Sequence, residues 1–233
     1  QDTSSAASDV YKRQPGTARQ PGAIWESNGT LLETMLRALG QSVTQRRVVA
    51  DQPDALRQAL LDLAHDCDVV VSTGGVSAGD TDWIRPLVAE LGAVDFWKLF
   101  LRPGRPFAFG SIGEGVPFFG LPGNPVAAAV TALQLLWPAL QVLEGQSEPE
   151  LFPRVMVELA DPLSRRPGRP ELARARLDTN AAGTLLARVD GSQASSRIGS
   201  LQQADLLLEL PAEAGPLESG TRLWAQLIRQ RIF

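Results

Sequence analysis

Between residues 24 and 143, segments with helical periodicity alternate with short apolar runs, and this alternation constrains the fold more than any other feature of the chain. The run 68–72 is apolar and rich in β-branched residues, which is typical of a strand buried on both faces of a sheet. Helices that alternate with buried strands predict an α/β domain. We therefore expect a mostly parallel sheet in three layers, with helices on both of its faces.

Local signals set the bounds of the expected elements. Ser27 or Asn28 is the expected cap of the first helix, Gly40 its left-handed stop, and Pro138 is expected to kink the last helix. The expected helices are 28–39, 53–63, 82–92 and 124–143. The expected strands are 43–49, 68–72, 94–101, 107–109 and 116–119.

Composition changes after residue 145 and suggests two domains. We expect residues 23–145 to form the α/β domain, 146–153 a linker, and 154–233 a smaller C-terminal β-rich domain. Residues 1–22 have no apolar periodicity and few large hydrophobic side chains, so we expect a disordered or non-native leader; a natural flexible tail is the alternative. The expected strands of the C-terminal domain are 155–159, 173–177, 185–189, 206–210 and 223–228.

Composition also excludes several classes of protein. With 44% hydrophobic and 21% charged residues, the chain is an ordinary globular one rather than a disordered one. A net charge of −4 argues against nucleic acid or an anionic membrane as a partner. One cysteine, Cys67, and one histidine, His65, exclude a disulfide framework and a zinc cage of thiolates and imidazoles. We expect no membrane span and a cytoplasmic protein.

The loop 73–82 follows the buried strand and contains three glycines. Glycines at such a position let backbone N–H groups approach a phosphate closely. Asp80 and Asp82 favour the start of the next helix, or they hold a divalent cation beside the phosphate. A glycine-rich turn followed by a helix cap explains the same residues, so the spacing alone leaves both interpretations open.

Two further loops stand at predicted strand ends. The turn 102–106 carries Arg102 and Arg105 and follows Lys98, and guanidinium groups bind tetrahedral oxyanions through paired hydrogen bonds. The loop 120–125 precedes the small residues 126–129, which leave the N–H groups of a first helical turn open to a ligand. The alternatives are a solvated surface turn for the first and close helix packing for the second.

Together, and in this order, the three loops resemble the MoeA family of molybdopterin molybdenumtransferases, which includes the gephyrin E domain. The resemblance is carried by TGGVSAGDTDW (73–83), FWKLFLRPGRPFAFG (96–110) and GLPGNPV (120–126). The tail resembles the family's C-terminal β domain through RPELARARL (169–177) and SQASSRIGSLQQADLLLELP (192–211). The implied activity is insertion of molybdenum from molybdate into adenylylated molybdopterin with release of AMP, supported by Mg²⁺.

The resemblance also implies roles for individual residues. The implied catalytic residues are Asp51, Asp82, Lys98 and Arg102, of which Asp51 and Asp82 would hold the cation. The implied molybdate-binding residues are Arg102, Arg105, Arg174 and Ser195. The implied binding residues for the pterin substrate are Gly74, Gly75, Ser77, Gly79, Asp80, Pro122, Gly123, Asn124 and Pro125.

The sequence departs from the family pattern in three places. Arg102 and Arg105 stand where the family has lysines, and Ala127 stands where it has a serine. The family's two further N-terminal domains and its first strand, with an acidic STGDE-like motif, are absent. We therefore expect a fragment with an incomplete sheet and an incomplete active site.

Two other functions fit parts of the pattern. A molybdopterin adenylyltransferase of the MogA/MoaB type shares the first domain's motifs but lacks a region like 154–233. A gephyrin-like scaffold that binds receptor peptides uses the same fold without catalysis. The resemblance further implies a homodimer for the full-length protein and an adenylyltransferase upstream in the same synthesis.

Overall fold

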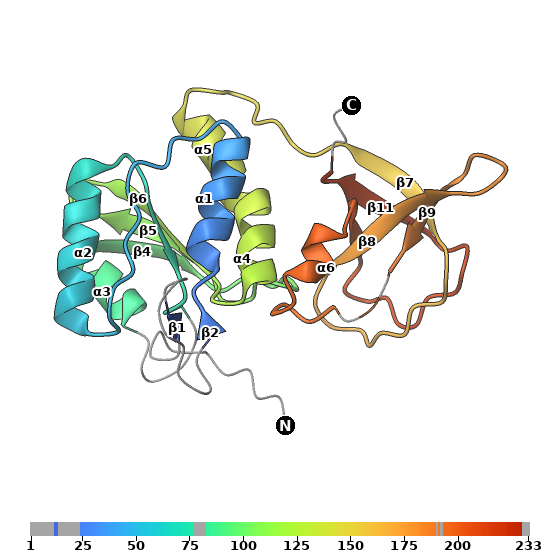
Figure 1. Ribbon diagram of the computed structural model, residues 1–233, viewed down its shortest axis with the longest axis horizontal. Helices are drawn as coiled ribbons and strands as arrows, with labels where there is room; N and C mark the ends of the chain where they lie inside the picture. The colour runs from blue at the N-terminus through green and yellow to red at the C-terminus, as the bar shows by residue number, and fades with distance from the viewer. Residues whose placement is uncertain (1–11, 14–23, 77–82, 190, 192, 230–233) are drawn as a thin grey trace. The chain divides into compact units, whose positions relative to one another are not determined.

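The computed structural model describes residues 12–13, 24–76, 83–189, 191 and 193–229, and the chain forms two compact units. The first unit comprises Gln1–Leu99 and Gly104–Trp137, and the second comprises Phe100–Pro103 and Pro138–Phe233. The short segment Phe100–Pro103, which lies within the second predicted loop, thus belongs to the C-terminal unit. Figure 1 shows the elements of both units along the chain.

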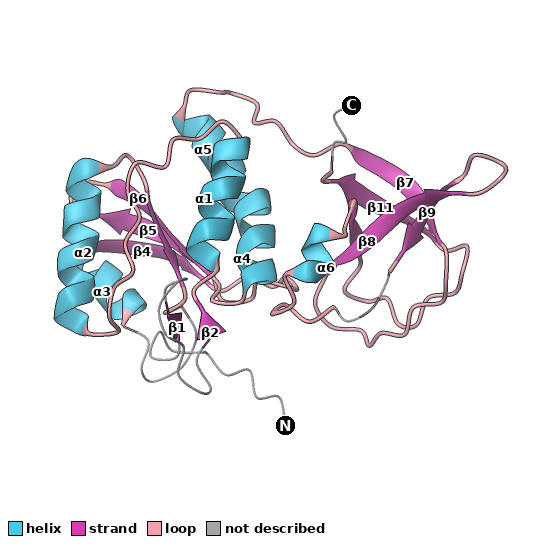
Figure 2. Ribbon diagram, viewed as in Figure 1, coloured by secondary structure: helices cyan, strands magenta, loops and turns pink. Residues whose placement is uncertain are grey.

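The first unit is an α/β domain with helices on both faces of its sheet (Figures 1 and 2). Its strands are β1 (Lys12–Arg13), β2 (Ile24–Trp25), β3 (Val70–Thr73), β4 (Gly92–Trp97), β5 (Ala108–Ile112) and β6 (Val116–Leu121). Its helices are α1 (Asn28–Ala38), α2 (Pro53–Asp66), α3 (Ile84–Leu91), α4 (Pro125–Thr131) and the π-helical segment η2 (Ala132–Leu136). The helix continues past the boundary of the unit as α5 (Trp137–Leu143).

The four-stranded sheet has the order β3-β6-β5-β4 and is mixed, so the expectation of a mostly parallel sheet is wrong. Only β3 and β6 are parallel, whereas β6 pairs with β5, and β5 with β4, in antiparallel fashion. Residues 113–115 alone connect β5 to β6, and a crossover to a parallel neighbour needs a dozen residues or more. The short connection therefore imposes a hairpin.

Two helical layers bury the faces of this sheet. Helices α2 and α3 pack on one face, over a core that contains Val70, Val88 and Phe118, each 2% exposed or less. Helices α1 and α4 pack together on the other face. Gly40 ends α1 in the left-handed conformation, with φ of 85°, and the N–H of Gln41 bonds back to the carbonyl of Leu36, as the sequence predicts.

The long apolar helix from Pro125 to Leu143 contains a π-helical segment rather than a simple kink. The N–H of Trp137 bonds to the carbonyl of Ala132, five residues back. Pro138 has no N–H and its ring clashes with the carbonyl four residues earlier, so the preceding turn widens. By length and hydropathy these 19 residues reach the threshold of a membrane span, contrary to expectation, but 67% of the apolar window is buried, as in a soluble core helix.

The remaining segments of the first unit are described by the pairing partners that they have or lack. The expected strand 43–49 has no ladder partner among the described residues, and its Arg46 instead forms an ion pair with Glu26 at 3.1 Å. Strand β3 is an edge strand of the described sheet, and its described partner is β6. Within the expected leader, the structure describes Lys12 and Arg13, which pair in parallel with β2.

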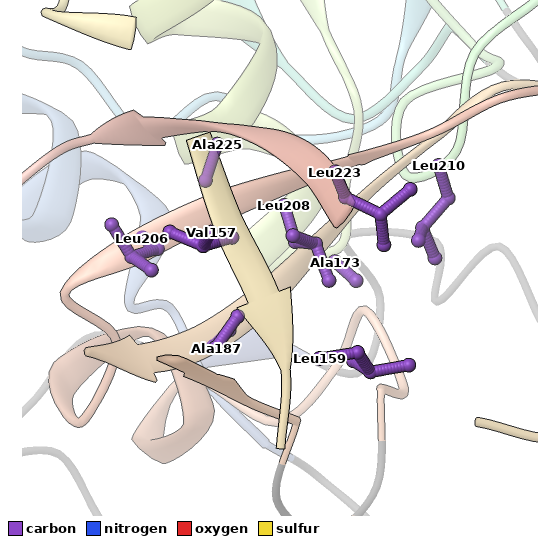
Figure 3. Packing of buried hydrophobic residues seen from close by; sticks show 10 residues of the cluster. Val157, Leu159, Ala173, Ala187, Leu206, Leu208, Leu210, Leu223 and Ala225 are labelled. Carbon is purple, nitrogen blue, oxygen red and sulfur yellow. The ribbon is translucent and has the colours of Figure 1, made fainter. Parts of the chain in front are cut away.

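The second unit is built on a closed five-stranded barrel with the order β10-β11-β7-β9-β8. Its elements are β7 (Arg154–Leu159), β8 (Glu171–Thr179), β9 (Leu185–Arg188), α6 (Gly199–Gln202), β10 (Leu206–Leu210) and β11 (Arg222–Leu227). Alternate side chains of β10, Leu206, Leu208 and Leu210, point into the barrel and pack against Val157 and its neighbours (Figure 3). The predicted strands of this region are all present within one or two residues.

Candidate active site

The three predicted loops leave the same edge of the sheet. In the register of the strands, Thr73 lies opposite Leu121, Ala108 opposite Gly120, and Trp97 opposite Ala108. These pairs form one row across the sheet, so the loops after β3, β4 and β6 all begin at this row. Adjacent strands lie about 4.8 Å apart, so the row spans roughly 15 Å, the dimension of a nucleotide-sized ligand.

The first and third loops pack against each other through glycine backbone. Gly74 and Gly75 have φ of 80° and 65°, which side chains rarely tolerate. The N–H of Gly74 donates to the carbonyl of Leu121 at 3.1 Å. A Cβ on Gly123 would lie 3.5 Å from the Cα of Gly74, so the two loops are in contact without intervening side chains.

The side chain of Asn28 holds the third loop in place through a hydrogen bond. Its side chain is 3% exposed, and its Nδ2 donates to the carbonyl of Gly123 at 2.8 Å. Ser27 is the N-cap residue of α1, as expected, but it makes no side-chain cap hydrogen bond; the carboxylate of Glu26 accepts the N–H of Gly29 at 2.9 Å instead. Asn28 is therefore a support of the candidate site that the sequence did not reveal.

Two backbone hydrogen bonds close the base of the second loop. The N–H of Lys98 donates to the carbonyl of Phe107 at 2.8 Å, and that of Leu99 to the carbonyl of Arg105 at 2.9 Å. Lys98 has φ of 83°, a strained value for a residue with a side chain. The side chains of Lys98 and Arg105 are both exposed at this turn, so their charges are available to an anion.

Gly104 lies at the point where this loop approaches α4. Its φ is 116°, and a Cβ there would lie 2.4 Å from Cγ2 of Thr131. Only glycine fits this position without displacement of the loop or of the helix. The close contact sets the distance between Gly104 and α4.

In the second unit, Arg102 joins the barrel through its main chain. Its N–H donates to the carbonyl of Pro170 at 2.9 Å, and its carbonyl accepts the N–H of Leu172 at 2.8 Å. These bonds form a parallel bridge with Glu171, the first residue of β8. The Nη1 of Arg102 lies 3.7 Å from Oε2 of Glu171, and its side chain is 61% exposed.

Three different segments cover one edge of β8 in succession. Arg102 occupies the edge beside Glu171, and β9 pairs with it from Arg176 onward. Between them, the amide of Gln193 bonds to both the N–H and the carbonyl of Arg174, at 2.9 and 3.1 Å. The side chain of Gln193 thus replaces one rung of a β-ladder and holds the 193–200 segment against the strand.

Arg174 is 3% exposed, and its guanidinium is held by two hydrogen bonds. Its Nε donates to the hydroxyl of Ser200 at 3.1 Å, and its Nη2 to the carbonyl of Ala194 at 3.3 Å. The hydroxyl of Ser200 in turn donates to the carbonyl of Arg197 at 2.7 Å. Ser195, which the resemblance assigns to molybdate, is half-buried in the turn between Ala194 and Arg197.

Burial lowers the pKa of Arg174 from its usual value, because the charged guanidinium loses contact with water. The negative charge of Glu171 raises this pKa and the positive charge of Arg102 lowers it, so both groups interact with Arg174. The guanidinium nevertheless keeps its proton, since arginine titrates far above neutral pH. The barrel thus holds a permanent, nearly buried positive charge, and guanidinium groups form strong hydrogen bonds with oxyanions.

Several predicted site residues are not brought together by the described part of the chain. Asp51 is half-buried just before α2. Lys98 and Arg105 belong to the first unit, whereas Arg102 belongs to the second. The residues Ser77, Gly79, Asp80 and Asp82 lie outside the described residues.

The opposite edge of the sheet carries a hollow of about 440 Å³, lined by residues 64–68 and 114–117. His65 is exposed there and contacts Asp66 at 2.8 Å, as expected of a surface histidine. Cys67 is half-buried and lies 3.5 Å from the hydroxyl of Thr44. The hollow is separated from the three loops by the length of the strands, so it is no part of the candidate site.

Known proteins share both units of this chain. Residues 13–142 match a family described as the probable molybdopterin binding domain, and residues 156–227 match the MoeA C-terminal region (domain IV). A molybdopterin molybdenumtransferase of Haemophilus influenzae is 30% identical over 205 residues, covering 88% of this chain and 50% of the relative. The cinnamon protein of Drosophila melanogaster, a molybdenum cofactor synthesis protein, is 35% identical and is covered to 33%.

Structural similarity agrees with these matches. The crystal structure of a molybdopterin biosynthesis MoeA protein from Pyrococcus horikoshii aligns with a TM-score of 0.78 and 25% identity, over 94% of this chain and 52% of that one. The fold and the matched regions thus define an α/β domain of the probable molybdopterin-binding family, followed by a C-terminal β-barrel. The chain belongs to the MoeA family. It spans a third to about half of the length of these relatives.

Proposed function

We propose that this chain supplies the substrate- and oxyanion-binding part of a molybdopterin molybdenumtransferase, which inserts molybdenum from molybdate into adenylylated molybdopterin and releases AMP. The single observation that carries the proposal is the row of three loops at one edge of the sheet. Exposed glycine backbone at such an edge favours a phosphorylated ligand. The names of the relatives supply the identity of that ligand.

The proposed site residues have two tasks: one group binds the pterin substrate, and the other binds the oxyanion. Gly75, which is exposed, and Gly123 present backbone N–H groups to the phosphate-bearing pterin, and Asn28 holds the third loop in place through the carbonyl of Gly123. Lys98 contributes an exposed positive charge at the same edge, where charge develops as the phosphoanhydride bond to AMP breaks. Arg174 in the barrel binds the tetrahedral oxyanion, since its guanidinium is oriented before the ligand arrives.

A divalent cation beside the phosphate is part of the proposed activity. Asp51 is a suitable carboxylate ligand, but Asp82, its proposed companion, lies outside the described residues. Within the described part of the chain, no three His, Cys, Asp or Glu side chains gather as a metal site. When bound, Mg²⁺ would neutralise the phosphate bridge.

The assembly of the full-length protein is also a proposal. Homodimerisation, receipt of substrate from a molybdopterin adenylyltransferase, and a cytoplasmic location are consistent with membership of the family. The match of residues 156–227 to the MoeA C-terminal region argues against an adenylyltransferase for this chain itself. A scaffold role is disfavoured by the buried, prearranged guanidinium of Arg174, which a peptide-binding surface does not require.

The test incubates the chain with adenylylated molybdopterin, molybdate and Mg²⁺, and measures bound nucleotide and released AMP. We expect the chain to bind the adenylylated pterin and, in the full-length protein, to release AMP only when molybdate is present. In the full-length protein, Asp82→Asn should abolish AMP release without unfolding it. Absence of nucleotide binding, or consumption of ATP instead, would contradict the proposal.

A further inference from the structure

The segment 193–200 and Arg174 form one hydrogen-bonded unit. Four hydrogen bonds join them. The side-chain amide of Gln193 makes two with the main chain of Arg174, and Ala194 and Ser200 each accept one from its guanidinium. The position of the guanidinium and the position of the segment therefore depend on each other.

Hydrogen bonds, rather than apolar packing, hold this segment in place. Ala194, Arg197 and Ile198 are exposed, and Ile198 is 41% exposed although its side chain is large and apolar. The carbonyl of Ala194 accepts the N–H of Arg197 at 3.2 Å, so the chain turns back at the surface. Such a turn buries little apolar area, so we expect it to move when one of its attachments to the barrel is lost.

Gln193 attaches the segment to the main chain of β8. Its amide accepts the N–H of Arg174 at 2.9 Å and donates to the carbonyl of the same residue at 3.1 Å. It thereby occupies the stretch of this edge between the bridge of Arg102 with Glu171 and the pairing of β9, which begins at Arg176. Two backbone groups of a nearly buried residue are satisfied in this way, and leaving them unpaired would be costly.

We propose that Gln193 is a positioning residue for oxyanion binding, which acts through the guanidinium of Arg174. Because it attaches the segment to the strand at the level of Arg174, it keeps Ala194 and Ser200 where they orient Nη2 and Nε. Within the described part of the chain Nη1 has no hydrogen-bond partner, so the oriented guanidinium presents it to a tetrahedral anion. The inference rests on the proposed function, because it takes Arg174 as the oxyanion-binding residue.

Gln193→Ala removes the attachment and leaves the guanidinium in the chain. The segment then no longer holds Nη2 and Nε of Arg174, so the anion has to order a long side chain when it binds. We expect molybdate to bind roughly three- to tenfold more weakly, as the cost of ordering one such side chain implies. Calorimetry on the full 233-residue chain measures this dissociation constant, under conditions where circular dichroism shows the variant to be folded.

Gln141 provides a matched control, because its side chain makes the same pair of hydrogen bonds elsewhere in the second unit. It is 3% exposed, donates to the carbonyl of Glu150 at 3.2 Å and accepts the N–H of the same residue at 2.7 Å. Gln141→Ala should therefore lower the urea midpoint about as much as Gln193→Ala does, and leave the dissociation constant for molybdate unchanged. A glutamine with a purely structural role at position 193 would behave in the same way.

A second comparison tests whether Gln193 acts through Arg174. Arg174→Lys keeps a positive charge but has no guanidinium for Ala194 and Ser200 to hold. In that background Gln193→Ala should change the dissociation constant by less than about twofold, whereas independent effects would multiply. Gln193→Asn keeps both hydrogen-bonding groups on a shorter side chain, so its loss of affinity should be smaller than that of Gln193→Ala.

The outcomes separate this inference from the proposed function. If Arg174→Ala weakens molybdate binding but Gln193→Ala binds it as tightly as the wild type, only the role of Gln193 is overturned. The same holds if Gln141→Ala loses as much affinity, or if the effects of Gln193→Ala and Arg174→Lys multiply. If Gln193→Ala does not fold, Gln193→Asn takes its place, and wild-type affinity in that variant overturns the inference. If the wild-type chain binds no molybdate, or if Arg174→Ala changes nothing, the oxyanion site is refuted and the inference with it.

Discussion

Substitution of Asn28 by alanine tests whether α1 supports the third loop. The side-chain amide is buried, and its hydrogen bond to the carbonyl of Gly123 is 2.8 Å long. A hydrogen bond of this kind contributes about 1 kcal/mol net, and the carbonyl left behind costs more where water cannot replace the amide. Gly123 is half-buried, so water can take the place of the lost Asn28 amide only in part. We expect Asn28→Ala to lower the free energy of unfolding by about 1–2 kcal/mol.

Urea unfolding followed by tryptophan fluorescence measures this change. Four of the five tryptophans belong to the first unit and Trp224 alone to the second, so the signal reports mainly on the domain that contains Asn28. The control is Gln58→Ala, which removes an exposed hydrogen bond to Asp62 on α2 and should cost less than about 0.5 kcal/mol. Equal midpoints for the two variants would refute the reasoning. Asn28→Ala should also weaken binding of adenylylated molybdopterin.

Two other predictions concern the second loop and the far edge of the sheet. Gly104→Ala should destabilise the first unit by about 1–3 kcal/mol more than Gly113→Ala, because both glycines have positive φ but only the former meets Thr131; equal urea midpoints would contradict it. The hydrogen bond to Asp66 raises the pKa of His65, so Asp66→Asn should lower the pKa that NMR records for this single histidine. The pair stabilises the fold below the unfolded pKa of about 6.5, and this contribution is lost as pH rises through the higher folded value.

Periodicity and turn chemistry predicted most elements because each depends on residues close in sequence. Helix α2 begins at Pro53 as a proline at a first helical position predicts, and Gly40 ends α1 as expected. The antiparallel direction of β5 and β6 follows from the three residues that connect them, which are too few for a crossover, whereas the alternation of helices and strands alone predicts parallel neighbours. The run 43–49 has the pattern of a strand, yet pattern does not provide a pairing partner.

The supports of the candidate site were not predictable, because each joins residues far apart in sequence. Asn28 and Gly123 are 95 positions apart, and an asparagine at a helix start is ordinarily interpreted as a cap. Gln193 has no sequence signal of its own, since its role arises where β9 stops pairing with β8. Ser200 was likewise missed, although it lies within the motif that carries the resemblance.

Arg102 stands where the resemblance implies a lysine, and its main-chain anchoring does not depend on which of the two side chains is present. Its position is set by main-chain hydrogen bonds to Pro170 and Leu172, which do not depend on the side chain. The side chain at position 102 therefore affects only which anions bind there and the geometry of that binding. A lysine presents a compact point charge, whereas a guanidinium contacts a carboxylate and an oxyanion through separate N–H groups. Because these main-chain bonds remain in the variant, Arg102→Lys should leave the urea midpoint unchanged and weaken oxyanion binding, since a lysine has no paired N–H groups; an unchanged dissociation constant for molybdate would contradict this.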